Sequence, residues 1–429
     1  MTNPKKFLIN LMDQVKDSII LKEGSAPPLH LGKGEGSLQA TIEVHHPDFY
    51  SRVLSEGSLG LGESYCEGWW DVEDDRLVEF LGILLVSPLY FEITGNYRHL
   101  AKILFHRLRT SPATWARRKR NIASHYDLSN DFYQLMLDET MGYTCGYATG
   151  PEQSLQQLQE NKYDLICRKL DLKPGDSLVD VGCGWGGFLI HAAKNYGIHG
   201  RGVTLSEDQV SLAGEKIRAA GLEDRISVDL LDYQELTGTY DKVAAIGIME
   251  HVGLKHYRLF MEKLRDLLKP SGRGLVHTIG CTDQISVKPE PWIQKYIFPG
   301  GRLPRLQEIA SAMLETDLTV AHMENLKQHY ALTLNHWHRN VLRNQSAIRH
   351  LGPGFDEKFM RIWRWYLNSC EAGFQYDVLH LYQVLFCKGI DWPFGLLRGW
   401  PEAKARTRAG ARGKPESPGS KRPHPEAVL

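Results

Sequence analysis

The residues best suited to chemistry in this 429-residue chain are glycines that follow an acidic residue. They form the pattern Asp180-x-Gly182-x-Gly184-x-Gly186, and Gly187 follows directly. Glycine tolerates positive φ and lets a ligand approach the backbone closely. The spacing differs from the Gly-x-Gly-x-x-Gly of dinucleotide sites, and no Gly-Lys-Ser/Thr follows as in a P-loop. We therefore expect a ligand with an amino group and a ribose but no phosphates, a description that S-adenosylmethionine fits.

An apolar strand and a helix flank these glycines. The segment 178–181 has the character of a buried strand, and 188–194 that of a helix whose first N–H groups can bind an electron-rich group. A strand-turn-helix unit that uses glycine only for packing is the alternative interpretation.

Strands and helices alternate beyond this unit. The periodicity of 155–170 predicts a helix ahead of the first strand. We expect further strands at 200–204, 226–231, 240–248 and 274–279, with helices at 207–220 and 256–268. This pattern predicts an α/β fold with a doubly wound, mostly parallel sheet. A long helical, tryptophan-rich section follows, and the apolar run 381–387 then adds the late antiparallel strand that is usual in methyltransferase sheets.

Polar side chains follow the second and third strands of this series, where ligands of doubly wound folds bind. Thr204 stands where an acidic ribose ligand is usual, so either Glu207 or Gln209 makes that contact or no residue does. Asp232 and Tyr233 suit an adenine ring and its amino group, although Asp232 also suits a helix N-cap.

The fourth and fifth strands carry a carboxylate and two histidines. Glu250 and His251 are adjacent at the end of one strand, and this pair suits acid–base chemistry or ligand binding beside a methyl donor. His277 lies in an otherwise apolar strand, where a single histidine is more often a satisfied core residue. Its place near a strand end, one strand away from Glu250, favours a functional role.

Composition narrows the class of protein. The formal net charge is zero, with 51 basic and 51 acidic residues, so the whole molecule offers no electrostatic attraction to nucleic acid. Seven cysteines without a Cys-x-x-Cys pair favour free thiols over disulfides or a zinc site. No signal peptide is expected, and the most apolar run, 80–86, is far shorter than the ~20 residues that span a bilayer.

Composition along the chain predicts four parts. Residues 1–105 suggest a small α+β domain that opens with an amphipathic helix through Leu8, Leu11, Met12, Val15 and Ile19. Residues 106–120 are a basic linker, which suits either plain solvation or contact with anionic phosphates. Residues 121–395 form a domain that contains the glycine turn and the alternating strands and helices, and 396–429 form a basic tail expected to be disordered.

Many short motifs, in order, resemble the bacterial cyclopropane-fatty-acyl-phospholipid synthases. The resemblance covers roughly residues 35 to 390. It extends to the mycolic acid cyclopropane synthases in the second domain only. It is carried by Gly57-Ser-Leu-Gly-Leu-Gly-Glu-Ser-Tyr65, Gly68-Trp-Trp70, Tyr143-Thr-Cys145, the glycine turn, Gly202-Val-Thr-Leu-Ser206, Met249-Glu-His-Val-Gly253, His277-Thr-Ile-Gly280, Trp292-Ile-Gln-Lys-Tyr-Ile-Phe-Pro299 and Tyr366-Leu-Asn-Ser-Cys370.

The resemblance implies a class I methyltransferase fold with a seven-stranded sheet, and methyl transfer from S-adenosylmethionine to a cis double bond of a phospholipid acyl chain. The resulting carbocation loses a proton from the added methyl, closing a ring, and the family is understood to use bound bicarbonate as the base. Matched by motif, the bicarbonate ligands are Cys145, Glu250, His277 and Tyr330, and Cys370 is the active-site thiol. The donor contacts are Tyr143, Thr144, Tyr233 and Gln234, beside the glycine turn, Thr204, Leu205, Gln209 and Asp232.

The resemblance further implies a homodimer that touches the membrane peripherally, on its cytoplasmic face. One departure is Ala148, where the family commonly has an aromatic residue, and this leaves the preferred double-bond position open. Two other enzymes remain as alternatives: one that ends in a methyl-branched or methylene chain, and a small-molecule methyltransferase. A lipid-binding protein with a vestigial donor site is disfavoured because the residues expected to contact the donor and the bicarbonate are all present.

Overall fold

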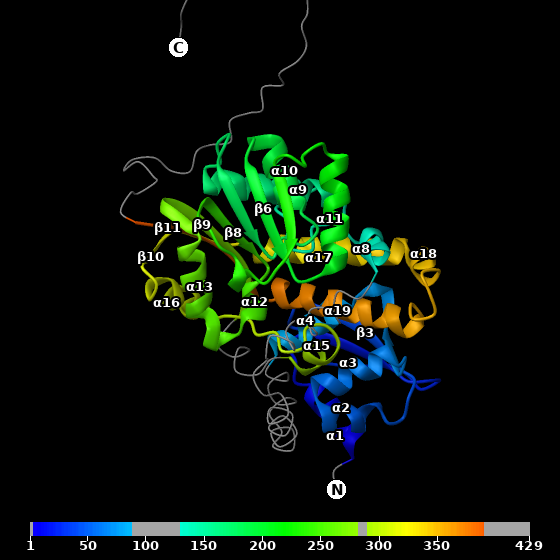
Figure 1. Ribbon diagram of the computed structural model, residues 1–429. Coiled ribbons are helices and arrows are strands. Elements are labelled where there is room, and N and C mark those ends of the chain that lie inside the picture. The colour runs from blue at the N-terminus through cyan, green and yellow to red at the C-terminus, as the bar shows by residue number, and fades with distance from the viewer. Residues whose placement is uncertain (1–2, 88–128, 282–289, 390–429) are drawn as a thin grey trace, which may run out of the picture. The chain divides into compact units, whose positions relative to one another are not determined.

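The computed structural model describes residues 3–87, 129–281 and 290–389 (Figure 1). The expected basic linker and the basic tail lie outside the described residues, as do the expected domain boundaries. The four parts predicted from composition therefore stay predictions.

A mixed sheet of seven strands, in the order β10-β11-β9-β8-β5-β6-β7, organises the larger part of the chain (Figure 1). Strands β5 to β9 run parallel, whereas β11 pairs antiparallel with β9 and β10 antiparallel with β11. The predicted α/β class and the late antiparallel strand are therefore confirmed. The strands are β5 (Ser177–Val181), β6 (His199–Thr204), β7 (Ile226–Leu230), β8 (Tyr240–Ile246), β9 (Leu268–Cys281), β10 (Leu318–Asn325) and β11 (Leu379–Lys388).

Helices connect these strands and cover both faces of the sheet, as the doubly wound pattern requires. Alternation along the strands decides which side chains meet which helices. Val276 of β9 and Val384 of β11 face the cluster that holds Phe260 of α13 and Met313 of α16. The helices are α8 (Asn130–Met136), α9 (Leu155–Leu170), α10 (Gly187–Tyr196), α11 (Glu207–Ala219), α12 (Met249–Val252), α13 (Tyr257–Asp266), α15 (Pro291–Tyr296), α16 (Leu306–Leu314), α17 (Lys327–Arg343), α18 (Gln345–Arg349) and α19 (Glu357–Gln375).

Helix α9 packs against the other face of the sheet and ends as the sequence predicts. Its N-terminus has a capping box, in which the side chain of Ser154 accepts from the backbone of Gln157 and the side chain of Gln157 accepts in return. Its C-cap, Asp171, adopts the left-handed conformation that closes a helix. Both ends are thus determined locally.

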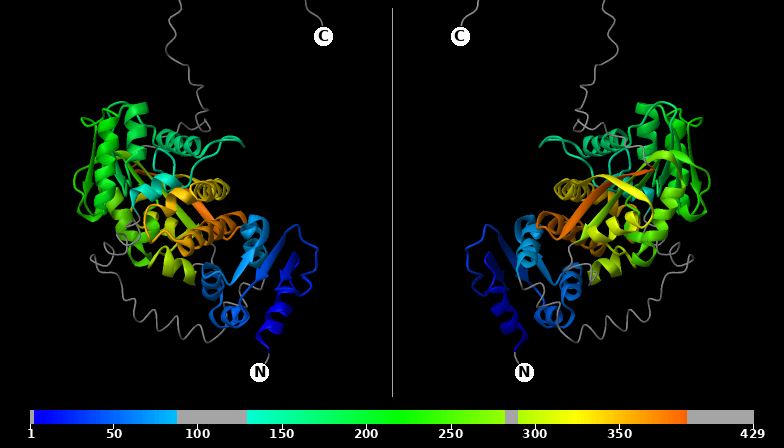
Figure 2. Two further views of the ribbon diagram at one scale, coloured as in Figure 1. Left: turned by 90° about the vertical axis from the view of Figure 1, so that its right-hand side faces the viewer. Right: turned by 90° about the vertical axis from the view of Figure 1, so that its left-hand side faces the viewer.

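The N-terminal elements form a second, four-stranded sheet with the order β2-β1-β3-β4. They contact α19, where Arg361 Nη2 donates to the carbonyl of Trp70 at 2.9 Å and Arg364 pairs with Asp75 at 2.6 Å. Helices α17 and α19 lie between these elements and the larger sheet in all views (Figures 1 and 2). The elements are α1 (Pro4–Met12), β1 (Ser18–Lys22), β2 (Leu29–Leu31), β3 (Gln39–Val44), α2 (Phe49–Glu56), α3 (Ser58–Cys66), β4 (Trp70–Val72) and α4 (Leu77–Val86).

Two expectations about secondary structure are wrong. The opening helix stops at Met12, and Ile19 lies in β1, where it pairs in parallel with Ala40 of β3. The section expected to be helical is helical at its tryptophans, in α17 and α19, but it also contains strand β10, which pairs along β11. In both places the pairing of distant segments overrides a local apolar spacing that suited a helix.

No helix in residues 3–87, 129–281 or 290–389 is long and apolar enough to cross a membrane.

Close packing at Gly62 of α3 generates a prediction about stability. A Cβ at this position would lie 2.6 Å from Cδ1 of Trp292 and 2.8 Å from Nε1 of Trp365, and both rings are buried. We expect Gly62→Ala to lower the free energy of unfolding by about 1–3 kcal/mol, measured by urea denaturation, because neither ring can move away freely.

The matched control is Gly214→Ala, in helix α11, where an added Cβ meets nothing within 4 Å. There the better helix propensity of alanine leaves stability unchanged or raises it by up to ~1 kcal/mol. Equal stability of the two variants would contradict the packing argument.

Candidate active site

The glycine turn opens the first of two adjoining cavities, here called the donor cavity. Gly182 and Gly184 have φ of 77° and 55°, in the left-handed region that favours glycine. A Cβ on Gly182 would lie 2.7 Å from Cδ1 of Ile248, whereas a Cβ on Gly184 would meet nothing within 4 Å. The turn therefore packs closely on one side and leaves the backbone open on the other, as close approach of a ligand requires.

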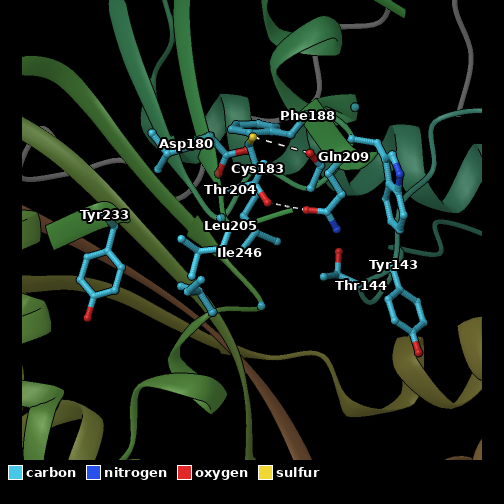
Figure 3. Close-up of a pocket in the computed structure, with 18 of the residues that line it drawn as sticks. Tyr143, Thr144, Asp180, Cys183, Phe188, Thr204, Leu205, Gln209, Tyr233 and Ile246 are labelled. Carbon is cyan, nitrogen blue, oxygen red and sulfur yellow. Dashed lines mark hydrogen bonds between the residues drawn. The ribbon is translucent and has the colours of Figure 1, made fainter. Parts of the chain in front are cut away.

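Most of the residues predicted to hold the donor line this cavity (Figure 3). Tyr143 and Tyr233 lie on opposite sides of it (Figure 3). Gly186 and Gln234 are not among the lining residues: Gly186 is the N-cap of α10, and the carbonyl of Gln234 accepts from Lys263. The predicted residues that do line the cavity are Tyr143, Thr144, Asp180, Gly182, Gly184, Gly187, Thr204, Leu205, Gln209, Asp232 and Tyr233.

Two buried groups of opposite charge lie in the donor cavity. Burial raises the pKa of Asp180 to about 7, and its Oδ1 has no hydrogen-bond partner among the described residues. Burial lowers the pKa of Lys162 to about 8, and its Nζ donates to Oγ1 of Thr144 at 2.8 Å. An unpartnered carboxylate oxygen beside an open glycine backbone fits the amino group of S-adenosylmethionine.

Sequence reasoning missed Lys162, although the chain carries a signal for it. Lys162 comes four residues after Leu158 and four before Ile166, so it falls on the apolar stripe of α9. A charged residue on a buried stripe is rare without a partner, and this is a reason to examine it.

Of the two residues proposed for the ribose contact, Gln209 lines the donor cavity. Oγ1 of Thr204 donates to Oε1 of Gln209 at 2.5 Å, and this leaves the Gln209 amide NH₂ as a donor in the cavity (Figure 3). Glu207 is not among the lining residues. Asp232 fits both interpretations, since its Oδ1 accepts from the backbone N–H of Gln234 at 2.9 Å while it also lines the cavity.

The second cavity, here called the apolar cavity, shares part of its wall with the first. Tyr143, Thr144, Gly247 and His251 line both. The rest of its wall is mainly apolar, and much of it comes from α4, α15, α17, α19 and the segment after α15, including Leu81, Leu84, Ile293, Phe298, Leu334, Trp365 and Phe374. Four predicted catalytic residues line this cavity: Glu250, His277, Tyr330 and Cys370.

Glu250 is held by the backbone of the neighbouring strand. Its Oε1 accepts from the N–H of Ile279 at 2.6 Å, and its Oε2 has no partner among the described residues. Burial raises its pKa to about 7. One carboxylate oxygen is thus fixed and the other has no partner at the wall of the apolar cavity, and the group changes its protonation state near neutral pH.

His277 lies one strand away, and the two cysteines differ in their placement. Nδ1 of His277 is 3.1 Å from Nε2 of Gln383, and burial holds the pKa of His277 well below its usual range. Burial raises the pKa of Cys370 to about 12, so this thiol is a weak nucleophile. Cys145 lines neither cavity; it is fully buried, and its Sγ donates to the carbonyl of Gly146 at 3.1 Å.

Comparison with known proteins identifies the family of this chain. Residues 114–384 match the family described as mycolic acid cyclopropane synthetase. The chain belongs to the mycolic acid cyclopropane synthetase family. It is 38% identical to the cyclopropane-fatty-acyl-phospholipid synthase of Escherichia coli K12 over 359 residues, which are 83% of this chain and 90% of that protein. It is 33% identical to a tuberculostearic acid methyltransferase of Mycobacterium tuberculosis, over 86% of this chain and 90% of that one.

Membership of this family confirms the class I methyltransferase fold and an S-adenosylmethionine-dependent enzyme. A solved mycolic acid cyclopropane synthase, in complex with SAH and CTAB, superposes with a TM-score of 0.58 at 31% identity. That match covers 63% of this chain and 98% of the solved chain.

The pKa of Glu250 predicts how stability changes with pH. In the folded protein it is raised from 4.5 to about 7, so ionised Glu250 destabilises the fold above about pH 7. We expect Glu250→Gln to raise the melting temperature near pH 8, and the gain to shrink toward about pH 5, where wild-type Glu250 is protonated. Thermal unfolding at the two pH values measures this.

Glu308→Gln is a control with the opposite sign. Burial acts to raise the pKa of Glu308, but hydrogen bonds from Arg302 and Arg305 outweigh it and lower the pKa to about 2. This variant should destabilise the protein near pH 8. A stability gain of Glu250→Gln that is the same at both pH values would contradict the buried-carboxylate explanation.

Proposed function

We propose that the enzyme converts cis double bonds in the acyl chains of membrane phospholipids into cyclopropane rings. The methyl donor is S-adenosylmethionine, and bound hydrogencarbonate is the base that takes a proton from the added methyl. The observation that carries this proposal is the wall of Tyr143, Thr144, Gly247 and His251 shared by the donor cavity and the apolar cavity. Because the two cavities adjoin at these residues, a methyl group held in the donor cavity would lie next to an alkene held in the apolar cavity.

The lining of the apolar cavity suits an acyl chain better than a polar amine. An alkene is a weak nucleophile, so its reaction demands accurate placement and exclusion of water. The aromatic side chains of Phe298, Trp365 and Tyr366 line the cavity and can stabilise positive charge on the chain. S-adenosylmethionine, when bound, supplies the electrophilic methyl group, and Asp180, Gln209 and Tyr143 hold and orient it.

The polar corner of the apolar cavity suits a small oxyanion that also carries a proton. Glu250 Oε2 and His277 Nε2 are both buried and without a partner among the described residues, and Tyr330 lines the same cavity. Hydrogencarbonate offers one O–H to a carboxylate and oxygens to donors, and it supplies a base. We assign its binding to Glu250, His277 and Tyr330. Cys145, the fourth ligand that the resemblance implies, is not among the residues that line the cavity, and its thiol donates to the carbonyl of Gly146.

Relatives with a different product define the second candidate function. A tuberculostearic acid methyltransferase and a probable fatty acid methyltransferase of Pseudomonas putida are 33% and 35% identical to this chain. The same cation that closes a ring can end as a methyl-branched or methylene chain. The assay of this function must therefore distinguish a ring from a methyl-branched or methylene product.

We further propose that the enzyme acts as a homodimer bound peripherally to the cytoplasmic face of the membrane. A phospholipid acyl chain can enter a protein cavity only at the bilayer surface. Helix α4 contributes Leu81, Leu84 and Leu85 to the apolar cavity, which links the N-terminal elements to the substrate.

The function is tested with vesicles of unsaturated phosphatidylethanolamine and methyl-labelled S-adenosylmethionine. We expect label in the acyl chains, in a product that co-migrates with cyclopropane standards in gas chromatography. A branched or methylene product would favour the second candidate. Label found only in added soluble amines would contradict a lipid substrate.

Glu250→Gln tests the role of the carboxylate. We expect calorimetry to give unchanged S-adenosylhomocysteine affinity, while the turnover number falls by about 100-fold or more. Wild-type activity should decline as pH falls through about 7, since protonation removes the carboxylate that orients the anion.

The matched control is Glu371→Gln. Burial also raises the pKa of Glu371 to about 7, but this residue lines neither cavity. It should keep both the turnover and the acid limb of the pH profile. A Glu250→Gln enzyme with near wild-type turnover would exclude the proposed anion site.

A further inference from the structure

His277 belongs to a row of polar residues that crosses three adjacent strands. Gln383 of β11 lies directly opposite His277 of β9, and Glu324 of β10 lies directly opposite Gln383. Directly opposed residues project from the same face of a sheet. The next pair along, Val276 and Val384, faces the apolar cluster on the opposite side.

A lysine from α9 completes this row. Lys169 Nζ donates to Oε2 of Glu324 at 2.5 Å and to Oε1 of Gln383 at 2.7 Å. His277, Gln383 and Lys169 are each at most 1% exposed, whereas the Glu324 side chain is 32% exposed. The row thus runs from a carboxylate near the surface to an imidazole in the apolar cavity, through groups fully removed from water.

The chemistry of each group determines the direction of every hydrogen bond. An ammonium has donors only. Burial lowers the pKa of Lys169, and the Glu324 carboxylate bonded to its Nζ opposes this by favouring the charged form. Gln383 must therefore turn its carbonyl oxygen to Lys169 and its NH₂ to His277. Nδ1 of His277 then has to accept, so in the neutral ring the proton resides on Nε2.

We propose that Glu324, Lys169 and Gln383 are positioning residues that hold His277 as the Nε2–H tautomer, so that it donates a hydrogen bond into the apolar cavity. Only the nature of the acceptor, an oxygen of hydrogencarbonate, rests on the proposed function. His277 Nε2 has no partner among the described residues, so its N–H is available to such an oxygen. In this tautomer His277 binds and orients the anion, and it does not act as the base.

The low pKa of His277 supports this assignment. Burial is the main cause, and the charges of Lys162 and Lys169 lower it further. A histidine kept neutral has a single N–H, and its location then decides whether the ring offers a donor or an acceptor to the ligand. In other enzymes an incorrect histidine tautomer costs orders of magnitude in turnover although the geometry is intact.

The tautomer is measured on the protein without lipid, by ¹⁵N NMR of histidine-labelled enzyme, with His277→Gln to assign the signal. We expect an unprotonated Nδ1 and a protonated Nε2 in the wild type. In Gln383→Glu the carboxylate can only accept, so Nδ1 must become protonated. We expect turnover of this variant to fall roughly 10- to 100-fold with unchanged S-adenosylhomocysteine affinity.

Lys169→Met is the second variant, for the case that Gln383→Glu does not fold. Without the lysine the Gln383 amide can rotate, and the His277 signals should show both tautomers. A protonated Nδ1 in the wild type, or variants that keep the wild-type tautomer and turnover, would overturn the proposal. The expected tautomer together with no label in lipid would instead refute the proposed function and leave the row of positioning residues standing.

Discussion

The site depends on a small group of polar side chains that are kept away from water between the sheet and helices α9, α17 and α19. Four of these groups are buried: Glu250, His277, Asp180 and Lys162. Burial shifts the pKa of each in the direction that favours the neutral form of the group. Such groups are costly to bury unless their bonds are satisfied. Glu250, His277 and Lys162 each form a hydrogen bond within the protein, and all four groups line a cavity, where a bound ligand can satisfy the remaining polar atoms.

The antiparallel end of the sheet supplies much of this support. Because β11 pairs with β9 at the register Gln383 opposite His277, an amide lies next to the imidazole instead of a valine. A shift of one residue would place Val384 there and leave the imidazole nitrogen unsatisfied. The late strand is therefore part of the site as well as part of the fold.

The N-terminal elements are also joined to the site. Glu63 of α3 forms ion pairs with Lys295 of α15 and with Arg52 of α2, and α15 contributes Ile293 to the wall of the apolar cavity. Arg361 and Arg364 attach the same elements to α19, which carries Trp365, Tyr366 and Cys370 into that cavity. Displacing the N-terminal elements would therefore change the walls of the cavity for the acyl chain.

Local patterns in the sequence determined the parallel strands, the helices between them and the glycine turn. Helix α9 occupies Leu155–Leu170, the range that its periodicity predicts, because caps and an apolar stripe act within a few residues of one another. The motifs around Glu250 and His277 likewise identify the family without a structure. Only the tertiary structure decided that Ile19 and residues 318–325 are strands, since strand pairing joins segments far apart in the chain. It also decided the roles of Lys162, Lys169 and Gln383, because their hydrogen-bond partners lie far away in the sequence and no local spacing can specify them.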